Sequence, residues 1–223
     1  MRPAVATTVL GLALAVAAPT TWALTRPEAA GAPVEQALAA APASPGRVID
    51  QESPARPGSL PEVTARSAAP ADQELRPPPV RLTVPALGVD ASVEPVGVEP
   101  DGQMTIPAEV DRVGWYRFGP APGDDGSAVI AGHVDDREQG LGAMAPLLAA
   151  EVGHEVVVTD ATGAVSRWRV VSRELISKQV LPLDRLFARD GPARLTLITC
   201  GGPFLREFSS YRDNVVVVAE PVP

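Results

Sequence analysis

The sequence predicts a mainly β domain, built as a barrel or a sandwich, over residues 80–223. Short runs of β-branched and aliphatic residues recur along this stretch, and Gly, Pro and Asp residues separate them at short intervals. These runs do not alternate with long amphipathic segments, as they would in a β-α-β fold. A stretch of about 145 residues is a usual size for one domain with a single core.

The strand pattern covers the whole domain, and the last strand is the most apolar. We expect a short surface helix over residues 141–151 and a helical turn near residues 183–186. Residues 214–219 are apolar on both faces, so this strand should be central or well covered. The expected strands are residues 80–85, 92–98, 104–107, 113–116, 127–131, 155–159, 164–171, 195–198 and 214–219.

Residues 4–24 carry no charge and predict a membrane span. As a helix, about 20 residues cover roughly 30 Å, the thickness of a bilayer core. Arg2 precedes the run, so the positive-inside rule places the folded domain outside the cell. The alternative is a cleaved signal peptide, because residues 21–23 fit a small-x-small cleavage site. We favour an uncleaved signal anchor over residues 1–25, since Trp22 suits a membrane interface. The predicted location is therefore the cell membrane, with a single span and an extracellular domain.

Residues 26–79 predict a disordered linker. They consist mostly of Ala, Pro, Glu, Ser and Arg, with almost no aromatic residue, and cannot bury enough surface to order themselves. A flexible chain of this length has an r.m.s. span of about 40 Å, and the prolines should extend it further. Such a linker would lift the domain off the membrane. A disordered leader of no specific use is the alternative.

The charge balance argues against nucleic-acid binding. The chain has 27 Asp and Glu residues against 19 Lys and Arg residues, and no basic stripe or aromatic platform is visible. We therefore expect no nucleic-acid partner.

Cys200 is the only cysteine of the chain and a candidate nucleophile. It follows the strand predicted over residues 195–198, and Gly201 and Gly202 come next, which should leave the backbone open to a ligand. The alternative is a buried structural thiol, because free cysteine is among the most buried residue types.

The two histidines differ in their settings. His133 ends an apolar strand after a glycine, the same position that Cys200 occupies on its own strand. A strand-end histidine can also be purely structural. His154 lies in a turn before a strand, where we expect a solvated side chain with no catalytic role.

Three segments resemble the signature segments of sortases, the surface transpeptidases of Gram-positive bacteria. They are residues 195–200 (LTLITC), 131–133 (AGH) and 211–214 (YRDN). The resemblance covers about residues 80–222, and the anchor and linker also match the layout of the family. The Gly-Gly-Pro after Cys200 and the YRDN segment are most similar to class F within the class E and F sortases of actinobacteria.

The resemblance implies an eight-stranded antiparallel β-barrel with short helices, in which Cys200, His133 and Arg212 converge on a groove. Cys200 would attack a Thr-Gly bond in a sorting signal of the Leu-Pro-x-Thr-Gly type and form a thioacyl intermediate. His133 would protonate the leaving amine, and Arg212 would bind the substrate backbone and the oxyanion. Thr199 matches the threonine before the cysteine in the family and would position the substrate.

The implied partners are sorting-signal proteins, an amine of peptidoglycan or of a pilin, and the membrane. The chemistry agrees with the residue types, because an ordinary thiol is mostly protonated at neutral pH and needs a nearby cation or base. Arg206 is a second cation after Cys200. We prefer Arg212 because it precedes the last strand, as in the family. Two alternatives are a cysteine peptidase that mainly hydrolyses and a catalytically silent sortase-like binding domain.

No cofactor is expected. Some sortases are stimulated by calcium, and the pairs Asp124-Asp125 and Asp135-Asp136 are acidic, but we interpret them as solvated loop carboxylates. One cysteine and two distant histidines do not have the spacing of a zinc site, so no metal is expected. Trp115 and Trp168 lie in strand patterns and are predicted core residues.

Overall fold

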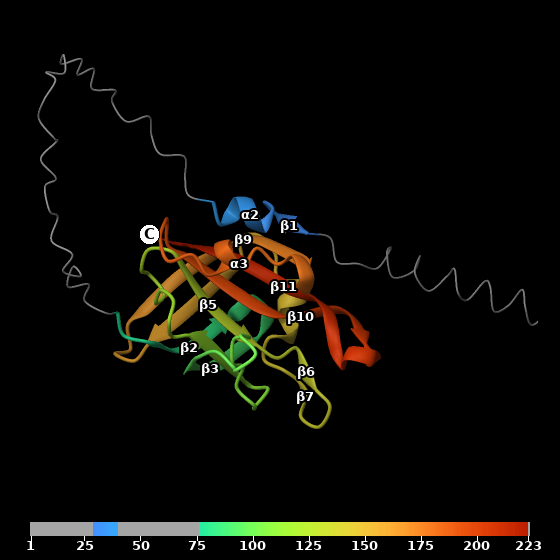
Figure 1. The fold of residues 1–223 in the computed structure, drawn as a ribbon. Helices are drawn as coiled ribbons and strands as arrows, with labels where there is room; N and C mark the ends of the chain where they lie inside the picture. The colour runs from blue at the N-terminus through green and yellow to red at the C-terminus, as the bar shows by residue number, and fades with distance from the viewer. Residues whose placement is uncertain (1–28, 40–75, 223) are drawn as a thin grey trace, which may run out of the picture.

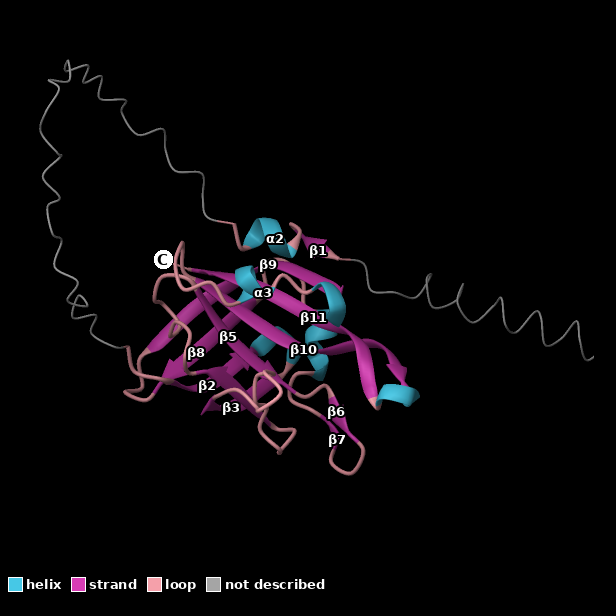
Figure 2. Cartoon of the chain, in the orientation of Figure 1, coloured by secondary structure: helices cyan, strands magenta, loops and turns pink. Residues whose placement is uncertain are grey.

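The computed structural model describes residues 29–39 and 76–222, and their regular secondary structure is mainly strands (Figures 1 and 2). The helices are short: α2 (Val34–Ala37), α3 (Leu183–Leu186) and 3₁₀ turns at Pro85–Leu87, Ala145–Ala149, Lys178–Val180 and Arg206–Phe208. The strands are β1 (Ala30–Gly31), β2 (Pro79–Val84), β3 (Val89–Val96), β4 (Arg112–Tyr116), β5 (Ser127–Gly132), β6 (Asp135–Asp136), β7 (Gly140–Leu141), β8 (Glu155–Asp160), β9 (Val165–Ser177), β10 (Arg194–Leu205) and β11 (Ser210–Pro221).

Eight strands close into a barrel in the order β9-β11-β10-β5-β4-β3-β2-β8, and β8 pairs again with β9. This confirms the expected eight-stranded, mainly β barrel with short helices. The expectation that the barrel is antiparallel throughout is wrong, because β3 pairs with β4 and β5 pairs with β10 in parallel. A parallel pair needs a long connection between its strands. Residues 97–111 connect β3 to β4, and β6 to β9 lie between β5 and β10 in the chain.

Apolar side chains from all eight barrel strands fill the interior. Leu195 and Leu197 of β10 and Val217 of β11 are fully buried there. Trp115 and Trp168 belong to the same cluster, which confirms both as core residues. β11 lies between β9 and β10 as a central strand, as its composition predicted.

Two expected elements differ from the structure. The segment predicted as a strand over residues 104–107 forms only an isolated bridge between Val98 and Met104. The helix predicted over residues 141–151 is a 3₁₀ turn, Ala145–Ala149, with a proline in its first turn. The chain before this turn passes close to His133, since a Cβ at Gly142 would lie 2.3 Å from the carbonyl oxygen of His133.

Residues 29–39 pack on the outer face of the barrel, across β9 and β11 (Figure 1). β1 adds to β9 as an antiparallel strand. Val34 and Ala37 of α2 are buried in a second apolar cluster with Val216 and Val218 of β11. This outer cluster also contains Leu186 and is flanked by Leu181, Phe187 and Ile198.

Polar contacts hold the same segment at three points. The Val34 amide donates to Oε2 of Glu174 at 3.0 Å, the Ser172 hydroxyl donates to the Ala32 carbonyl at 2.6 Å, and Nε of Arg194 donates to the Ala37 carbonyl at 2.8 Å. The prediction of a disordered linker is therefore wrong for residues 29–39. Their few apolar side chains suffice because the barrel offers a surface on which they are buried.

The rest of that linker, residues 40–75, and the span predicted within residues 1–25 lie outside the described residues. Within residues 29–39 and 76–222, the helices are all too short to cross a bilayer.

Candidate active site

The parallel pairing of β5 and β10 brings His133 and Cys200 to the same level of the sheet. His133 directly follows β5. The expectation that a strand ends at Cys200 is wrong, because β10 continues to Leu205 and Cys200 pairs with Asn214 of β11. The register runs from Ser127 opposite Arg194 to Ala131 opposite Ile198. His133 and Cys200 each follow the last rung of this register by two residues. The two residues therefore lie at the same level of adjacent strands, although only His133 is at a strand end.

Thr199 ties the two strands together beside these residues. Its hydroxyl is buried and donates to the carbonyl oxygen of Gly132 at 2.8 Å. This bond fixes the residue before Cys200 to the residue before His133. The hydroxyl is thus used within the protein, and direct binding of substrate by Thr199 stays a prediction.

A groove of about 630 Å³ opens over both residues. Cys200, His133, Thr199 and Lys178 line it together with Asn214, which pairs with Cys200 across β10 and β11. The remaining lining is mostly apolar and comes from Val98, Met104, Ile106, Tyr116, Ala131, Leu181, Leu183, Leu186, Phe187 and Ile198. Such a groove suits an extended peptide with apolar side chains near the thiol.

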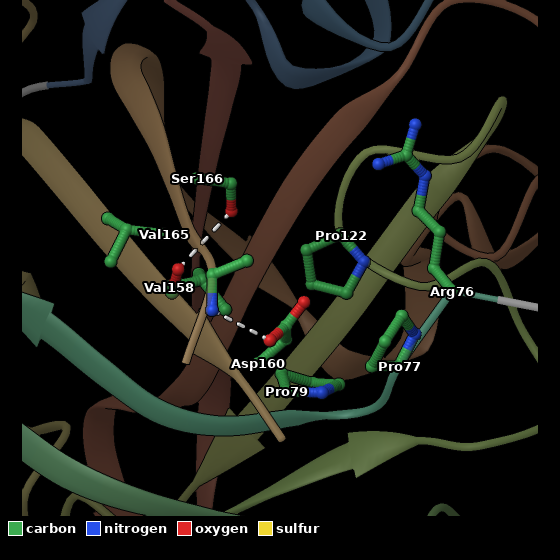
Figure 3. Close-up of a pocket in the computed structure, with 9 residues that line it drawn as sticks. Arg76, Pro77, Pro79, Pro122, Val158, Asp160, Val165 and Ser166 are labelled. Atoms are coloured by element: carbon green, nitrogen blue, oxygen red, sulfur yellow. Dashed lines mark hydrogen bonds between the residues drawn. The ribbon is translucent and has the colours of Figure 1, made fainter. Parts of the chain in front are cut away.

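A second hollow, of about 120 Å³, lies between the start of β2 and the β8–β9 hairpin (Figure 3). Its lining residues include Arg76, Pro122, Asp160 and Ser166. None of the candidate catalytic residues is among them. The larger groove is therefore the better candidate for a site of chemistry.

Gly201 and Gly202 make room for neighbouring side chains. A Cβ at Gly201 would lie 2.8 Å from Cγ2 of Val215 and 2.9 Å from Cδ1 of Leu175. At Gly202, where φ is +74°, a Cβ would lie 2.3 Å from Oδ2 of Asp213. Protein atoms therefore occupy the space that a side chain at either glycine would need, and the opening of this backbone to a ligand stays a prediction.

Arg212 lies on β11 two residues before Asn214, and therefore on the strand face that carries Asn214 opposite Cys200. Its Nε and Nη2 each donate to a carboxylate oxygen of Asp213 at 2.9 Å. Asp213 is 1% exposed, whereas the Arg212 side chain is 38% exposed. These bonds raise the pKa of the Arg212 guanidinium, so it stays charged. Arg212 is close in register to the thiol but is not part of the groove lining.

Lys178 makes a contact that the sequence did not reveal. Its Nζ lies 3.5 Å from Sγ of Cys200 and 2.9 Å from the hydroxyl of Ser210. Lys178 follows β9 at the start of a 3₁₀ turn, in a stretch for which the sequence predicted no strand. One signal was available, because it is the only lysine among the 19 Lys and Arg residues.

Tyr211 links the His133 segment to β11. Its hydroxyl donates to Oδ2 of Asp135 at 2.5 Å, and Asp135 lies two residues after His133. This hydrogen bond raises the pKa of Tyr211 to about 12, with burial as a smaller cause. The bond thus joins the segment after β5 to the strand that carries Arg212.

The other residues weighed in the sequence lie away from the thiol or have local partners. Asp124 pairs with Arg76 at 2.8 Å, and Asp136 accepts from the amides of Glu138 and Gln139. Among the described residues there is no group of three or more His, Cys, Asp or Glu side chains that could hold a metal ion. His154 lies in the turn before β8, and Arg206 is exposed on the 3₁₀ turn between β10 and β11.

A cysteine and a histidine at the same level of adjacent strands, both lining one mostly apolar groove, could act as a nucleophile and an acid–base partner. The family model described as the Sortase domain matches residues 82–222, and the chain belongs to this family. None of the curated proteins matches the chain in sequence.

Solved structures of sortases share the fold at low sequence identity. Sortase C-1 from Actinomyces oris superposes with a TM-score of 0.50 at 19% identity, over 64% of this chain and 73% of that one. Sortase A from Corynebacterium diphtheriae gives 0.50 at 18% identity, over 66% and 62%. Sortase C1 from Streptococcus suis gives 0.51 at 16% identity, over 67% and 75%. The barrel is therefore a sortase fold.

Proposed function

We propose that this protein is a cell-surface cysteine transpeptidase that joins proteins carrying a sorting signal to an amine of the cell wall. The observation that supports the proposal is the register of β5 and β10, by which His133 and Cys200 lie at the same level of adjacent strands and line one groove. Membership of the sortase family supports the same reaction class.

The reaction begins when Sγ of Cys200 attacks the carbonyl carbon of the Thr-Gly bond in a signal of the Leu-Pro-x-Thr-Gly type. The C–N bond then breaks, and His133 gives its proton to the departing glycine amine, which leaves a thioacyl enzyme. An incoming amine attacks the thioester, and His133 takes a proton from that amine and passes it to the sulfur of Cys200 as the C–S bond breaks. An amide bond forms as the thioester breaks, so no oxidant or reductant is needed.

Arg212 would stabilise the oxyanion or hold the substrate backbone. Asp213 limits the freedom of its guanidinium, since both oxygens of this buried carboxylate accept hydrogen bonds from it. A fixed, permanently charged fork is suited to a developing negative charge.

The apolar lining of the groove would receive the Leu-Pro end of the signal. Leu181, Leu183 and Phe187 come from the segment between β9 and β10, and Ile198 comes from β10 beside the thiol. Burial of a leucine and a proline against such side chains contributes about 1.5–3 kcal/mol for each large side chain.

The location, class and partners of the enzyme are also part of the proposal. Residues 1–25 would anchor it in the membrane with the barrel outside the cell, and the residues after Cys200 favour class F. The acceptor would be a peptidoglycan or pilin amine. A mainly hydrolytic peptidase and a silent binding domain are the competing functions.

The direct test is the intact mass of the full chain in detergent after incubation with a Leu-Pro-x-Thr-Gly or Leu-Ala-x-Thr-Gly peptide, with and without a glycine-based amine. A thioacyl adduct that passes to the amine is expected. The Cys200→Ala variant should give no adduct, and His133→Ala and Arg212→Ala should each slow its formation by at least about 100-fold.

Two other outcomes would favour the competing functions. Hydrolysed peptide as the main product even at high amine concentration would indicate a peptidase. No adduct with either peptide, together with slow alkylation of Cys200 by iodoacetamide, would indicate a silent binding domain.

A further inference from the structure

The cation that touches the sulfur of Cys200 is Lys178. Its Nζ lies 3.5 Å from Sγ, within hydrogen-bonding distance for sulfur, and donates to the Ser210 hydroxyl at 2.9 Å. The side chain is exposed, yet it is held between two partners from different strands, β10 and β11. A lysine that merely extended into solvent would have neither contact.

The backbone places Lys178 at this point through three paired strands. Ser177, the last residue of β9, pairs with Asp213 of β11, and Asp213 pairs with Gly201 of β10. Ser177, Asp213 and Gly201 are thus aligned across three strands, and Gly201 is the residue after Cys200. Lys178 is the first residue after β9, next to this aligned set. The turn Lys178–Val180 then begins with the Ser177 hydroxyl accepting from the Gln179 amide at 3.5 Å.

The other charged groups around the thiol have partners of their own. The Arg212 guanidinium is bonded through two nitrogens to the Asp213 carboxylate, and the Asp135 carboxylate accepts from Tyr211. His133 lines the same groove as Cys200. Lys178 thus places the full positive charge of its ammonium in direct contact with the sulfur.

The residue type supports a specific role. Arginine fills every other basic position of the chain, so the single lysine stands at the nucleophile. An ammonium is a compact charge with three rotatable donors, and it can bond to a hydroxyl and a sulfur at the same time. A planar guanidinium fits such a pair of unlike partners less well.

We propose that Lys178 is a catalytic residue whose ammonium donates to Sγ and stabilises the thiolate of Cys200 before it attacks, with Ser210 as the positioning residue for that ammonium. The proposal rests on the proposed function. Lys178 gains and loses no proton in the cycle. The thiol proton passes to His133, which holds it for the leaving amine. Because the ammonium is exposed, solvent and salt screen its effect, which should therefore be moderate.

The test measures alkylation of Cys200 by iodoacetamide, followed by intact mass, on the full chain in detergent at low salt. At pH 7 the Lys178→Met variant, similar in length but uncharged, should react about three- to fivefold more slowly than the native protein. Lys178→Arg, which keeps the charge, should recover at least about half of the native rate. Near pH 10, where an ordinary thiol is already mostly ionised, all rates should agree within about twofold.

A matched control removes a charge from the same end of the molecule. Arg206→Met on the turn between β10 and β11 should change the rate by less than about twofold, because distant exposed charges are screened. Ser210→Ala should give an intermediate loss that disappears when Lys178→Met is already present, since the two residues act as one unit.

Three results would overturn the proposal: a native alkylation rate for Lys178→Met at pH 7, an equal loss at pH 7 and near pH 10, or an equal loss for Arg206→Met. The assay uses no peptide, so it is independent of the transpeptidase test. If alkylation of Cys200 depends on the charge of Lys178 but no thioacyl adduct forms, the role of Lys178 at the thiol would stand and the proposed function would be refuted. If alkylation does not depend on the charge of Lys178 but the thioacyl adduct forms, the proposed function would stand and the role of Lys178 would be refuted.

Discussion

The two faces of the β10–β11 ladder differ in how they are covered. On the inner face, Leu195, Leu197, Val215 and Val217 are closed in by the other strands of the barrel. The outer face carries Ile198, Val216 and Val218, and Cys200 follows two residues after Ile198 on the same side.

The outer face is covered by segments that are not barrel strands. Residues 29–39 cover one end, and the segment between β9 and β10 covers the other end through Leu186 and Phe187. Both of these residues also line the groove. The inner face thus provides stability, whereas the candidate site is built on the face that the barrel does not need to close.

The largest expected effect is on the inner face. Leu197→Ala removes a fully buried side chain from the closed interior, and the remaining strands cannot collapse into the space. We expect a loss of about 3 kcal/mol in the free energy of unfolding, measured by denaturant titration of the full chain in detergent. A loss below about 1 kcal/mol would mean that the interior is as adaptable as the outer face.

A change at the covered end of the outer face should cost less. Val34→Asp places a carboxylate in an apolar site near Glu174, so residues 29–39 should undock rather than keep the charge buried. We expect about 1–2 kcal/mol of lost stability and new protease cleavage within the segment.

The same variant should affect the groove, because the outer cluster supports its wall. KM for a sorting peptide should rise severalfold, with kcat unchanged within about twofold. Gln36→Asp adds the same charge at an exposed position of α2 and should change neither quantity. An unchanged KM after undocking would show that the two ends of the outer face are independent.

Ile198→Ala tests the open end of the outer face. The side chain is half-buried, packs against the outer cluster and lines the groove. Stability should fall by only about 1 kcal/mol, since the groove already exposes part of it to water. KM should rise for a Leu-Pro-x-Thr-Gly peptide more than for one with Ala in place of Leu. Equal increases for both peptides would place the leucine of the signal elsewhere.

The smallest expected effect concerns Tyr211→Phe, which removes the hydroxyl bonded to Asp135. The pKa of Tyr211 is raised to about 12, above its ordinary value of 10. The folded state therefore binds this proton more tightly than the unfolded state does. The stability from this bond is fully present below pH 10 and is lost as the pH rises through about 12.

Unfolding of the native protein and of Tyr211→Phe between pH 8 and 12 checks this prediction. The difference between the two proteins should be constant below pH 10, shrink above it and be nearly absent at pH 12. No difference between the two proteins anywhere in this range would assign the contribution of Tyr211 to packing of its ring against Phe204, which the variant keeps.

The sequence predicted the barrel, most of its strands and the position of His133 at the end of its strand. These features depend on local patterns of apolar residues. It did not predict the contact of Lys178 with Cys200, which joins residues 22 positions apart, or the parallel pairing of β5 with β10. The buried hydrogen bond between Ser127 and Thr196, at 2.8 Å, joins residues 69 positions apart and has no local signal either. Such contacts become visible only when the strand order is known.

The docking of residues 29–39 changes the distance at which the enzyme would work. If residues 4–24 cross the membrane, only residues 25–28 connect the span to the docked segment, and four extended residues reach at most about 14 Å. The native barrel would then lie against the lipid surface. Undocking would release the rest of residues 26–79 as additional tether.

Neutron reflectometry of the chain in a supported bilayer, with and without Val34→Asp, measures this height. Equal heights would refute the short tether. A greater height for the variant would mean that docking of residues 29–39 sets the distance of the barrel from the membrane. The docked enzyme would then reach newly exported proteins at the membrane, and the undocked enzyme would reach deeper into the wall.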